Sequence, residues 1–258
     1  MKALITGASS GIGKNMAYVL ANKGVDLILV ARSKEEMIKI KDNVKVNVDI
    51  IEMDLLKEKN VFELYDMCKD KNIDILINNA GFGLFGIFTE TDLDRELEMI
   101  DLNIKAYHIL TKLFLKDFVE KDSVEKDSGY ILNVASSAGF MAGPRLSTYY
   151  ATKNYVLKLT MAINEELRKS GSHVVVSALC PGPVNTNFNK VANGEFSIKE
   201  VSPKFVAEYA IDKLFQKKML IIPTLRIKLG IFLLRLVPYR LQLSFCYHIQ
   251  GKKLGIKK

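Results

Sequence analysis

Residues 6–13 read Thr-Gly-Ala-Ser-Ser-Gly-Ile-Gly, and they stand between an apolar run, Ala3–Ile5, and a helical pattern, Gly11–Lys23. Glycines in such a turn let the backbone bend tightly and approach a phosphate without a Cβ in the way. The first amides of the helix and the positive end of its dipole complete an anion site. We therefore expect a pyrophosphate to bind at Gly7, Ser9, Ser10, Gly11, Ile12 and Gly13. The spacing is not that of the commonest dinucleotide fingerprint, so a glycine-rich connection that binds nothing is the alternative.

Apolar runs and helical patterns alternate along the chain. The expected strands are Ala3–Ile5, Asp26–Val30, Val46–Met53, Ile73–Ile77, Tyr130–Val134, His173–Leu179 and Met219–Ile222. The expected helices are Gly11–Lys23, Ser33–Asp42, Lys57–Lys69, about 92–119 with a break near Asp101, about 148–169, and Pro203–Lys217. Strands that are apolar on both faces and alternate with helices predict a parallel sheet covered on both sides. The predicted fold is α/β, a single-domain doubly wound Rossmann-like sheet over 1–222, followed by a basic, apolar helical extension at 223–258.

The end of the second expected strand indicates which dinucleotide binds. An acidic residue about 20 positions beyond the glycines would bind the ribose hydroxyls of NAD. Ala31 stands where we expect that acid, and Arg32 and Ser33 follow it. An arginine there can pair with a 2′-phosphate, so the sequence favours NADP(H) over NAD(H). A solvated surface charge is the alternative for Arg32.

Tyr149 and Lys153 are four residues apart at the start of an expected helix, so their side chains share a helix face. A free phenol has a pKa of about 10, and a neighbouring ammonium lowers it. The pair predicts that Tyr149 serves as a general acid for a carbonyl oxygen. Such a spacing also arises by chance on helix surfaces.

Together these motifs resemble the short-chain dehydrogenase/reductase family, and the resemblance covers nearly all of 1–222. The matching stretches are Thr6–Gly13, Asp54, Asn78-Asn-Ala-Gly81, Asn103, Ser136, Tyr149 with Lys153, and Pro181-Gly-Pro-Val-Asn-Thr186. Several matches in the right order are more specific than any one of them. The resemblance implies an oxidoreductase that interconverts a carbonyl and a secondary alcohol with a nicotinamide cofactor.

The resemblance also implies roles for individual residues. Ser136 would hold the substrate carbonyl, Tyr149 would deliver the proton, and Lys153 would lower the pKa of Tyr149 and bind the nicotinamide ribose. Asn103 would hold a water that links Lys153 to solvent. The residues implied to contact the cofactor elsewhere are Asp54, Leu55, Asn79, Ala80, Gly81, Pro181, Gly182, Val184 and Thr186. Their structural alternatives are helix capping, sheet geometry and ordinary loop packing.

The segments that shape the substrate site in this family are apolar here. Their large side chains are Phe82, Leu84, Phe85, Phe140, Met141, Phe188 and Phe196. Apolar walls suit a lipophilic substrate, such as a hydroxysteroid-like or 3-oxoacyl-like compound, and loop packing is the alternative. Arg145 is expected either to meet an anionic substrate group or to be solvated. A non-catalytic NADP(H)-binding sensor or a membrane-associated scaffold is the alternative function.

The net charge of +8 is concentrated at the end of the chain. Residues 213–258 contain eleven Lys or Arg and no Asp or Glu, so the preceding 212 residues hold 26 basic and 29 acidic side chains. Arg226, Lys228 and Arg235 interrupt the apolar run Leu225–Val237 too often for a membrane-spanning helix. The segment 225–250 is expected to lie on an anionic membrane surface, to close over the substrate pocket or to pack on another subunit. After Pro238, Leu241–Ile249 is expected to be helical, with a strand as the alternative.

Composition bounds the remaining properties. Three cysteines far apart predict no disulfide framework and a reducing compartment, and nothing predicts a metal site. The apolar run after Lys2 is too short for a signal peptide, so we expect a cytoplasmic protein, at most peripheral on a membrane. The body has no nucleic-acid recognition motif. A homodimer or homotetramer is implied by the family resemblance alone.

Overall fold

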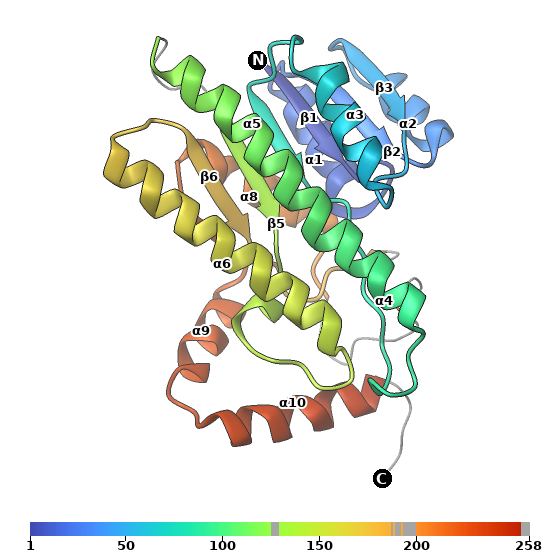
Figure 1. Cartoon of the computed structure of the whole chain (residues 1–258), viewed down its shortest axis with the longest axis vertical. Helices are drawn as coiled ribbons and strands as arrows, with labels where there is room; N and C mark the ends of the chain where they lie inside the picture. Colours follow the sequence, from blue (N-terminus) through green and yellow to red (C-terminus); the bar gives the residue numbers. More distant parts are fainter. Residues whose placement is uncertain (125–128, 187, 189–191, 193–199, 254–258) are drawn as a thin grey trace.

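Parallel strands form the centre of the structure, a computed structural model that describes residues 1–124, 129–186, 188, 192 and 200–253 (Figure 1). The strands are β1 (Lys2–Thr6), β2 (Asp26–Ala31), β3 (Val48–Glu52), β4 (Ile75–Asn78), β5 (Tyr130–Val134), β6 (Val175–Leu179) and β7 (Leu220–Ile221). In the described part of the chain they make a seven-stranded sheet in the order β3-β2-β1-β4-β5-β6-β7. The direction of the strand order reverses between β1 and β4, which is where such sheets bind ligands.

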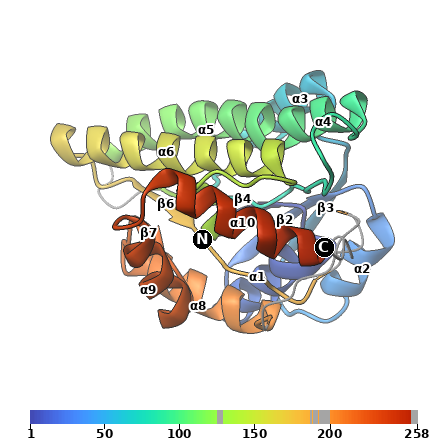
Figure 2. The same cartoon turned by 90° about the horizontal axis from the view of Figure 1, so that it is seen from below.

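Helices cover both faces of this sheet. They are α1 (Gly11–Asn22), α2 (Lys34–Lys41), α3 (Glu58–Cys68), α4 (Leu93–Ile100), α5 (Tyr107–Asp122), α6 (Ser147–Ser170), α8 (Pro203–Phe215), α9 (Leu225–Leu234) and α10 (Tyr239–Lys253). Figure 2 shows α3, α5 and α6 on one side of the sheet and α1, α2 and α8 on the other. The predicted doubly wound α/β fold, in a single domain, is therefore confirmed.

The alternation of side chains along each strand explains why the strands are apolar throughout. In β1, Ala3 and Ile5 pack into the core under α1 and α8, whereas Leu4 points into the core under α3 and α5. In β2, Leu29 packs into the core under α1 and α8, and Ile28 packs into the core under α3 and α5. A strand buried on both faces has no position for an exposed polar side chain, so its sequence reads as one apolar run.

A π-helical turn, η1 (Asp101–Ala106), joins α4 to α5. The predicted break near Asp101 is therefore a widened turn within continuous helix. Hydrogen bonds in a π-turn run from residue i to residue i+5, which displaces the backbone carbonyls from their α-helical partners. Such turns are frequent at functional sites, and this one contains Asn103.

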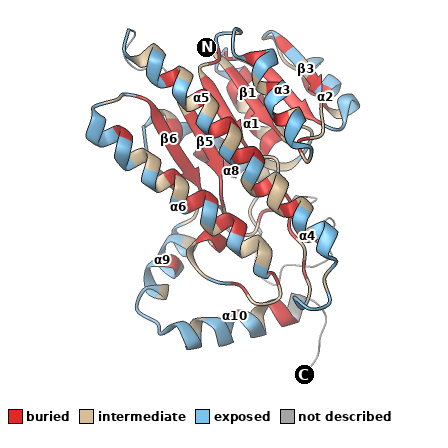
Figure 3. Cartoon of the chain, in the orientation of Figure 1, coloured by how far each residue is buried: buried red, intermediate tan, exposed pale blue. Residues whose placement is uncertain are grey.

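The C-terminal segment folds as two helices, α9 and α10, below the sheet in Figure 1. The helix predicted over Leu241–Ile249 is confirmed, and the strand alternative is wrong. Helix α9 packs on the 3₁₀ turn Ser137–Phe140 that follows β5. Most of the surface of both helices is exposed, in contrast to the buried sheet (Figure 3). Among the described residues, no helix is both long and apolar enough to cross a bilayer.

Candidate active site

A cavity of about 1420 Å³ lies at the carboxyl ends of the strands. Its walls come from the connections after β1 to β6 and from α9 and α10. The predicted site residues that line it are Gly7, Ser9, Ser10, Gly11, Ile12, Arg32, Ser33, Asp54, Leu55, Asn79, Ala80, Gly81, Ser136, Tyr149, Lys153, Pro181, Gly182, Val184 and Thr186. Two predicted residues, Gly13 and Asn103, do not line the cavity.

The glycine-rich turn is held against the loop after β4. Asn79 donates from Nδ2 to the carbonyls of Thr6, at 3.0 Å, and Gly7, at 3.1 Å. A Cβ on Gly13 would lie 2.4 Å from that Nδ2 and 2.5 Å from the Gly7 carbonyl oxygen. Gly7 and Gly11 have φ values of +64° and +55°, which favour glycine. Gly13 therefore shapes the turn from behind the cavity wall.

The first turn of α1 fits a bound anion. The residue that precedes the helix, Ser10, makes no side-chain hydrogen bond to its amides, and the first turn contains no acidic residue. The leading amides of a helix need an acceptor that the helix cannot supply. Ser9, Ser10 and Gly11 line the cavity at this point. These residues fit the pyrophosphate of a dinucleotide.

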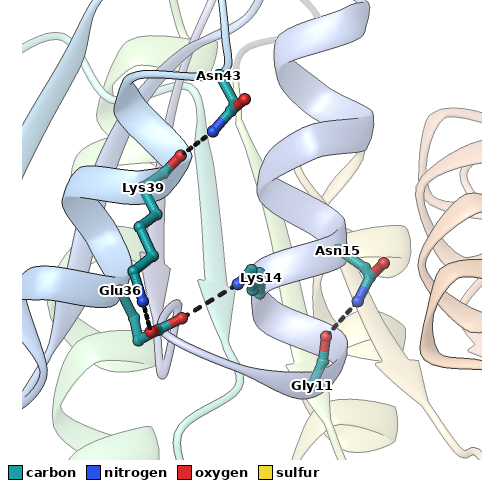
Figure 4. A network of polar contacts seen from close by, with 6 residues as sticks. All are labelled: Gly11, Lys14, Asn15, Glu36, Lys39 and Asn43. Atoms are coloured by element: carbon teal, nitrogen blue, oxygen red, sulfur yellow. Dashed lines mark hydrogen bonds and ion pairs between the residues drawn. The ribbon is translucent and has the colours of Figure 1, made fainter.

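The adenosine end of the expected cofactor site is basic at one position. Arg32 follows β2 on the cavity wall and is exposed. Beside it, Lys14 of α1 and Lys39 of α2 both pair with Glu36, at 3.2 and 2.5 Å (Figure 4). The hydrogen bond from Lys39 and then that from Lys14 lower the pKa of the Glu36 carboxyl. The charges of Lys14 and Lys39 are thus already paired with Glu36. We therefore keep Arg32 as the predicted partner for a 2′-phosphate.

Tyr149 and Lys153 lie together where α6 meets the end of β5. The Nζ of Lys153 donates to the carbonyl of Val134 at 2.9 Å and lies 5.9 Å from the centre of the Tyr149 ring. The Tyr149 hydroxyl is hydrogen-bonded to Ser136, and its ring contacts Phe188 at 5.2 Å between centroids. The structure thus brings Ser136, Tyr149 and Lys153, from two separate elements, to one part of the cavity.

The pKa of the Tyr149 phenol differs from expectation. Burial raises it to about 12, although the hydrogen bond with Ser136 lowers it. Burial also lowers the pKa of the Lys153 ammonium to about 8. Lys153 is not among the groups that shift the Tyr149 pKa, and its Nζ donates to the Val134 carbonyl. A phenol with a raised pKa is protonated at neutral pH, which is the form that a proton donor requires.

Asn103 lies behind the cavity wall and is fully buried. Its Nδ2 donates to the carbonyl of Phe82 at 2.9 Å and to the hydroxyl of Thr152 at 3.1 Å. Its Oδ1 accepts from the amide of Phe82 at 3.1 Å. A Cβ on Gly81 would lie 2.7 Å from that Oδ1 and 3.5 Å from Lys153 Nζ. Asn103 therefore fixes the loop after β4 beside Lys153.

Sequence reasoning missed Tyr107 and Thr152. The hydroxyl of Tyr107 donates to the same Val134 carbonyl at 3.3 Å, and the Lys153 Nζ lies 5.1 Å from the centre of its ring. Thr152 lies between Tyr149, whose carbonyl it binds at 2.8 Å, and Asn103. Thr152 is next to the Tyr-x-x-x-Lys pair, but Tyr107 carries no motif that could have singled it out.

The apolar side chains expected around the substrate divide into two groups. Phe82, Met141 and Phe188 line the cavity, whereas Leu84, Phe85 and Phe140 do not. Phe85 packs instead into a small core with Leu146. Phe196 lies outside the described residues.

Arg145 does not line the cavity and is partly exposed. Its guanidinium stacks over the ring of Tyr247 on α10, at 3.9 Å to the ring centre. A Cβ on Gly251 would lie in the space that this guanidinium occupies. Gln250, one residue earlier and buried, donates to the hydroxyl of Tyr150 at 2.7 Å. We call Arg145, Tyr150, Tyr247, Gln250 and Gly251 the α10 latch. Their contacts hold the end of α10 against the loop that precedes α6 and against α6 itself, which carries Tyr149.

The rest of the substrate end is built by the C-terminal helices. The side chains of α9, α10 and their connection that line the cavity include Ile227, Ile231, Leu233, Leu234, Val237, Leu241, Phe245, Ile249 and Gln250. Of the three places expected for this segment, the pocket wall is therefore the one that the structure shows.

Comparison with known proteins gives consistent matches. A family model described as short chain dehydrogenase matches residues 1–195. An uncharacterized oxidoreductase of Staphylococcus saprophyticus is 36% identical over 220 residues, which are 83% of this chain and 91% of the relative. A short-chain dehydrogenase from Sphingobium yanoikuyae, solved in complex with NADPH, is 30% identical with a TM-score of 0.81, over 91% of this chain and 92% of that one. A bulky-bulky ketone specific alcohol dehydrogenase from Comamonas testosteroni is 28% identical with a TM-score of 0.76, over the same shares.

Proposed function

The chain belongs to the short-chain dehydrogenase family of oxidoreductases, and we propose that it interconverts a carbonyl and a secondary alcohol on a lipophilic substrate with NADP(H). The observation that carries this proposal is the meeting of Ser136, Tyr149 and Lys153 in a cavity whose far side is apolar. The glycine-rich turn forms one end of that cavity, and α9 and α10 form the other.

The choice of NADP(H) is supported by the charge at the adenosine end. Arg32 provides a guanidinium on the cavity wall, and no acidic side chain follows β2 at the position that would bind a ribose hydroxyl. A guanidinium binds a phosphate through two parallel hydrogen bonds. The relative from Sphingobium, whose solved structure holds NADPH, supports the same choice.

The chain's own residues supply positioning and a proton. When bound, the nicotinamide supplies the hydride that adds to the carbonyl carbon. Ser136 donates a hydrogen bond to the carbonyl oxygen and holds it beside Tyr149. The neutral phenol of Tyr149 then gives its proton to that oxygen, which becomes the product hydroxyl. In the opposite direction, Tyr149 accepts the proton.

Lys153 and Asn103 restore the proton on Tyr149. The Lys153 ammonium has further N–H bonds beside the one to Val134, and these bind the ribose of the cofactor. Its charge becomes more favourable when a phenolate forms nearby, because the two charges then attract in a buried site. The π-turn at Asn103 holds the water that connects Lys153 to solvent.

The cavity wall supports the proposed substrate class. Phe82, Met141 and Phe188 line the same cavity as the apolar side chains of α9 and α10. Apolar walls with few polar groups select a ligand by shape and apolar area. The relative named for bulky-bulky ketones supports a large, hindered carbonyl compound, and hydroxysteroid-like and 3-oxoacyl-like compounds both have this character.

We also propose that the chain forms a homodimer or homotetramer through the outer faces of α5 and α6. The exposed ring of Tyr155 on α6 bonds His108 on α5 at 2.7 Å, so the two helices present one continuous face. Light scattering on the purified protein tests this proposal, and a monomer at micromolar concentration would contradict it.

The experiment is NADPH oxidation by the purified protein against carbonyl compounds that range from small aldehydes to steroid ketones and 3-oxoacyl thioesters. We expect turnover to rise with the apolar area of the substrate. Tyr149→Phe should bind NADPH normally and lose turnover, because it lacks only the proton donor. Tyr18→Phe, a half-buried tyrosine on α1 that does not line the cavity, is the control and should retain turnover. Normal turnover in Tyr149→Phe would refute the proposed mechanism.

A further inference from the structure

The outer surface of α9, α10 and their connection is unusually apolar. Eleven large apolar side chains of these elements are exposed, and we call the eight most exposed of them the C-terminal apolar surface: Leu225, Leu229, Phe232, Leu233, Leu236, Tyr239, Leu241 and Phe245. Leu225 and Tyr239 are each 81% exposed, so the fold itself does not bury them. Exposed apolar patches of this kind mark sites where a protein meets another molecule or a membrane.

The charges that surround this surface have one sign. Arg226, Lys228, Arg235 and Arg240 are exposed on the same two helices and their connection, and Arg226 also lines the cavity. Residues 213–258 contain no acidic side chain, so none of these charges is neutralised from within the segment. The occupant of the surface should therefore be anionic. A second copy of the chain, docked by the same surface about a twofold axis, would bring positive charge against positive charge.

The cavity opens through this surface. Leu233, Leu241 and Phe245 are exposed and also line the cavity, so they form its rim. An apolar molecule that entered across this rim from an aqueous phase would meet the apolar surface first. A lipid phase held against the same surface would place a dissolved substrate at the mouth of the cavity without passage through water.

We propose that the C-terminal apolar surface docks on the face of an anionic lipid bilayer. Its leucines and aromatic rings insert among the lipids, while Arg226, Lys228, Arg235 and Arg240 bind the headgroups. The helices lie in the interface, since the arginines and lysine that interrupt them prevent a span. Delivery of a lipophilic substrate from the bilayer to the cavity rests on the proposed function, whereas the docking itself does not.

Vesicle flotation with the full chain tests the proposal. The probes are vesicles of phosphatidylcholine alone and of phosphatidylcholine mixed with phosphatidylglycerol. We expect the chain to float with the anionic vesicles and to remain unbound with the neutral ones. The bound fraction should fall when salt is raised from about 0.1 M to about 1 M, because the Debye length then shrinks from about 10 Å to about 3 Å.

Two triple variants separate the apolar from the charged contribution. Leu229→Gln/Phe232→Gln/Leu236→Gln changes exposed side chains that do not line the cavity. Lys228→Gln/Arg235→Gln/Arg240→Gln changes exposed charges on the same helices and their connection. We expect each variant to lower the partition coefficient at least tenfold. The controls are Phe62→Gln/Met67→Gln on α3 and Lys23→Gln/Lys41→Gln/Lys59→Gln, which change exposed residues elsewhere and should bind as the wild type does.

Equal flotation of the wild type and both triple variants would overturn the proposal. So would an oligomer of the wild type that binds no vesicles and dissociates in the Leu229/Phe232/Leu236 variant, because a second copy would then cover the surface. Flotation needs no turnover, so its failure leaves the proposed oxidoreductase activity standing. NADPH oxidation with a small water-soluble aldehyde needs no vesicles, so loss of that activity leaves the docking standing.

Discussion

The amide of Gln250 donates a 2.7 Å hydrogen bond to the hydroxyl of Tyr150, across 100 residues of sequence. Tyr150 follows the proposed proton donor directly, so this bond ties the last turns of α10 to the catalytic part of α6. The thiol of Cys246 also approaches the Tyr150 hydroxyl, at 4.0 Å. The position of α10 over the cavity therefore depends on a hydroxyl that takes no part in the proposed chemistry.

Tyr150→Phe should loosen α10 while leaving the proton donor in place. The substitution leaves the buried Gln250 amide without its partner, which costs about 1–3 kcal/mol. We expect faster hydrogen exchange in α10 and a raised KM for a bulky ketone, with little change in kcat for a small aldehyde. Tyr155→Phe is the matched control on the same helix. Unchanged exchange and unchanged KM would show that the α10 latch does not hold the helix.

Lys153→Met should change the pH dependence of stability. The folded-state pKa of Lys153, about 8, lies below its ordinary value of 10.5. Between these values the unfolded chain binds more protons than the folded chain, so the stability of the wild type rises with pH through this window. Below about pH 8 the whole penalty of the buried ammonium is present. Methionine carries no charge, so Lys153→Met has neither the cost of a buried ammonium nor the rise of stability with pH that follows from it.

The measurement for Lys153→Met is the free energy of unfolding in urea from about pH 7 to about pH 10. The wild type should gain about 3 kcal/mol relative to the variant as pH rises through the whole window, a figure that follows from the pKa shift. Lys158→Met, an exposed lysine on the same helix, serves as control. If the wild type and Lys153→Met gave parallel curves, the ammonium would not be desolvated as the structure shows.

Arg32→Glu should reverse the preference between the two dinucleotides. Loss of charge-assisted hydrogen bonds to a 2′-phosphate, followed by repulsion, should raise the Kd for NADPH by about tenfold to a hundredfold. The Kd for NADH should change little, because a carboxylate can bind the ribose hydroxyls. Fluorescence titration of each nucleotide gives both constants, with the neighbouring exposed Lys34→Glu as control. Equal losses for both nucleotides would contradict the assignment.

Gly13→Ala should disrupt the phosphate-binding turn, because residue 13 packs against the side of the turn that faces away from the cavity. The new methyl would lie 2.4 Å from Asn79 Nδ2 and 2.5 Å from the Gly7 carbonyl oxygen, so the turn must shift. Overpacking of this kind costs about 1–3 kcal/mol of stability, and the shifted amides should weaken dinucleotide binding. Gly24→Ala is the control, since its methyl would meet nothing within 4 Å and only its φ of +76° is strained. Normal nucleotide binding by Gly13→Ala would show that the turn tolerates the shift.

The sheet could be predicted because its strands carry an unambiguous signal. Tyr130–Val134 was expected with its observed bounds, since a buried apolar run is set between a charged loop and polar turn residues. The last strand is shorter than expected, at Leu220–Ile221, although the carbonyl of Met219 before it still accepts from the amide of Ala178 in β6. The break expected near Asp101 gave the position of the π-turn, but the pattern did not show that the helix continues through it as a widened turn.

The substrate end was less predictable. Leu241–Ile249 suggested both strand and helix because α10 is apolar on two sides: Ile249 faces the cavity, while Leu243 and Tyr247 are exposed. Arg145 is part of the α10 latch because of a stacking partner 102 residues further along the chain, which no local pattern reveals. The raised pKa of Tyr149 comes from its burial, which is a property of the folded chain.

The separation in sequence between the proposed proton-transfer residues and α9 and α10 has a consequence for how the substrate site can change. The residues proposed to transfer the proton all precede Pro223, whereas much of the wall that meets the substrate follows it. Few side chains of the last two helices are buried, Ile231, Cys246 and Gln250 among them, so substitutions there disturb little of the packed interior. A graft of residues 224–253 from a relative should therefore exchange which compound is reduced while the chemical step is inherited unchanged. Under the proposed function, the choice of substrate would then change through two helices whose substitution costs the packed core little.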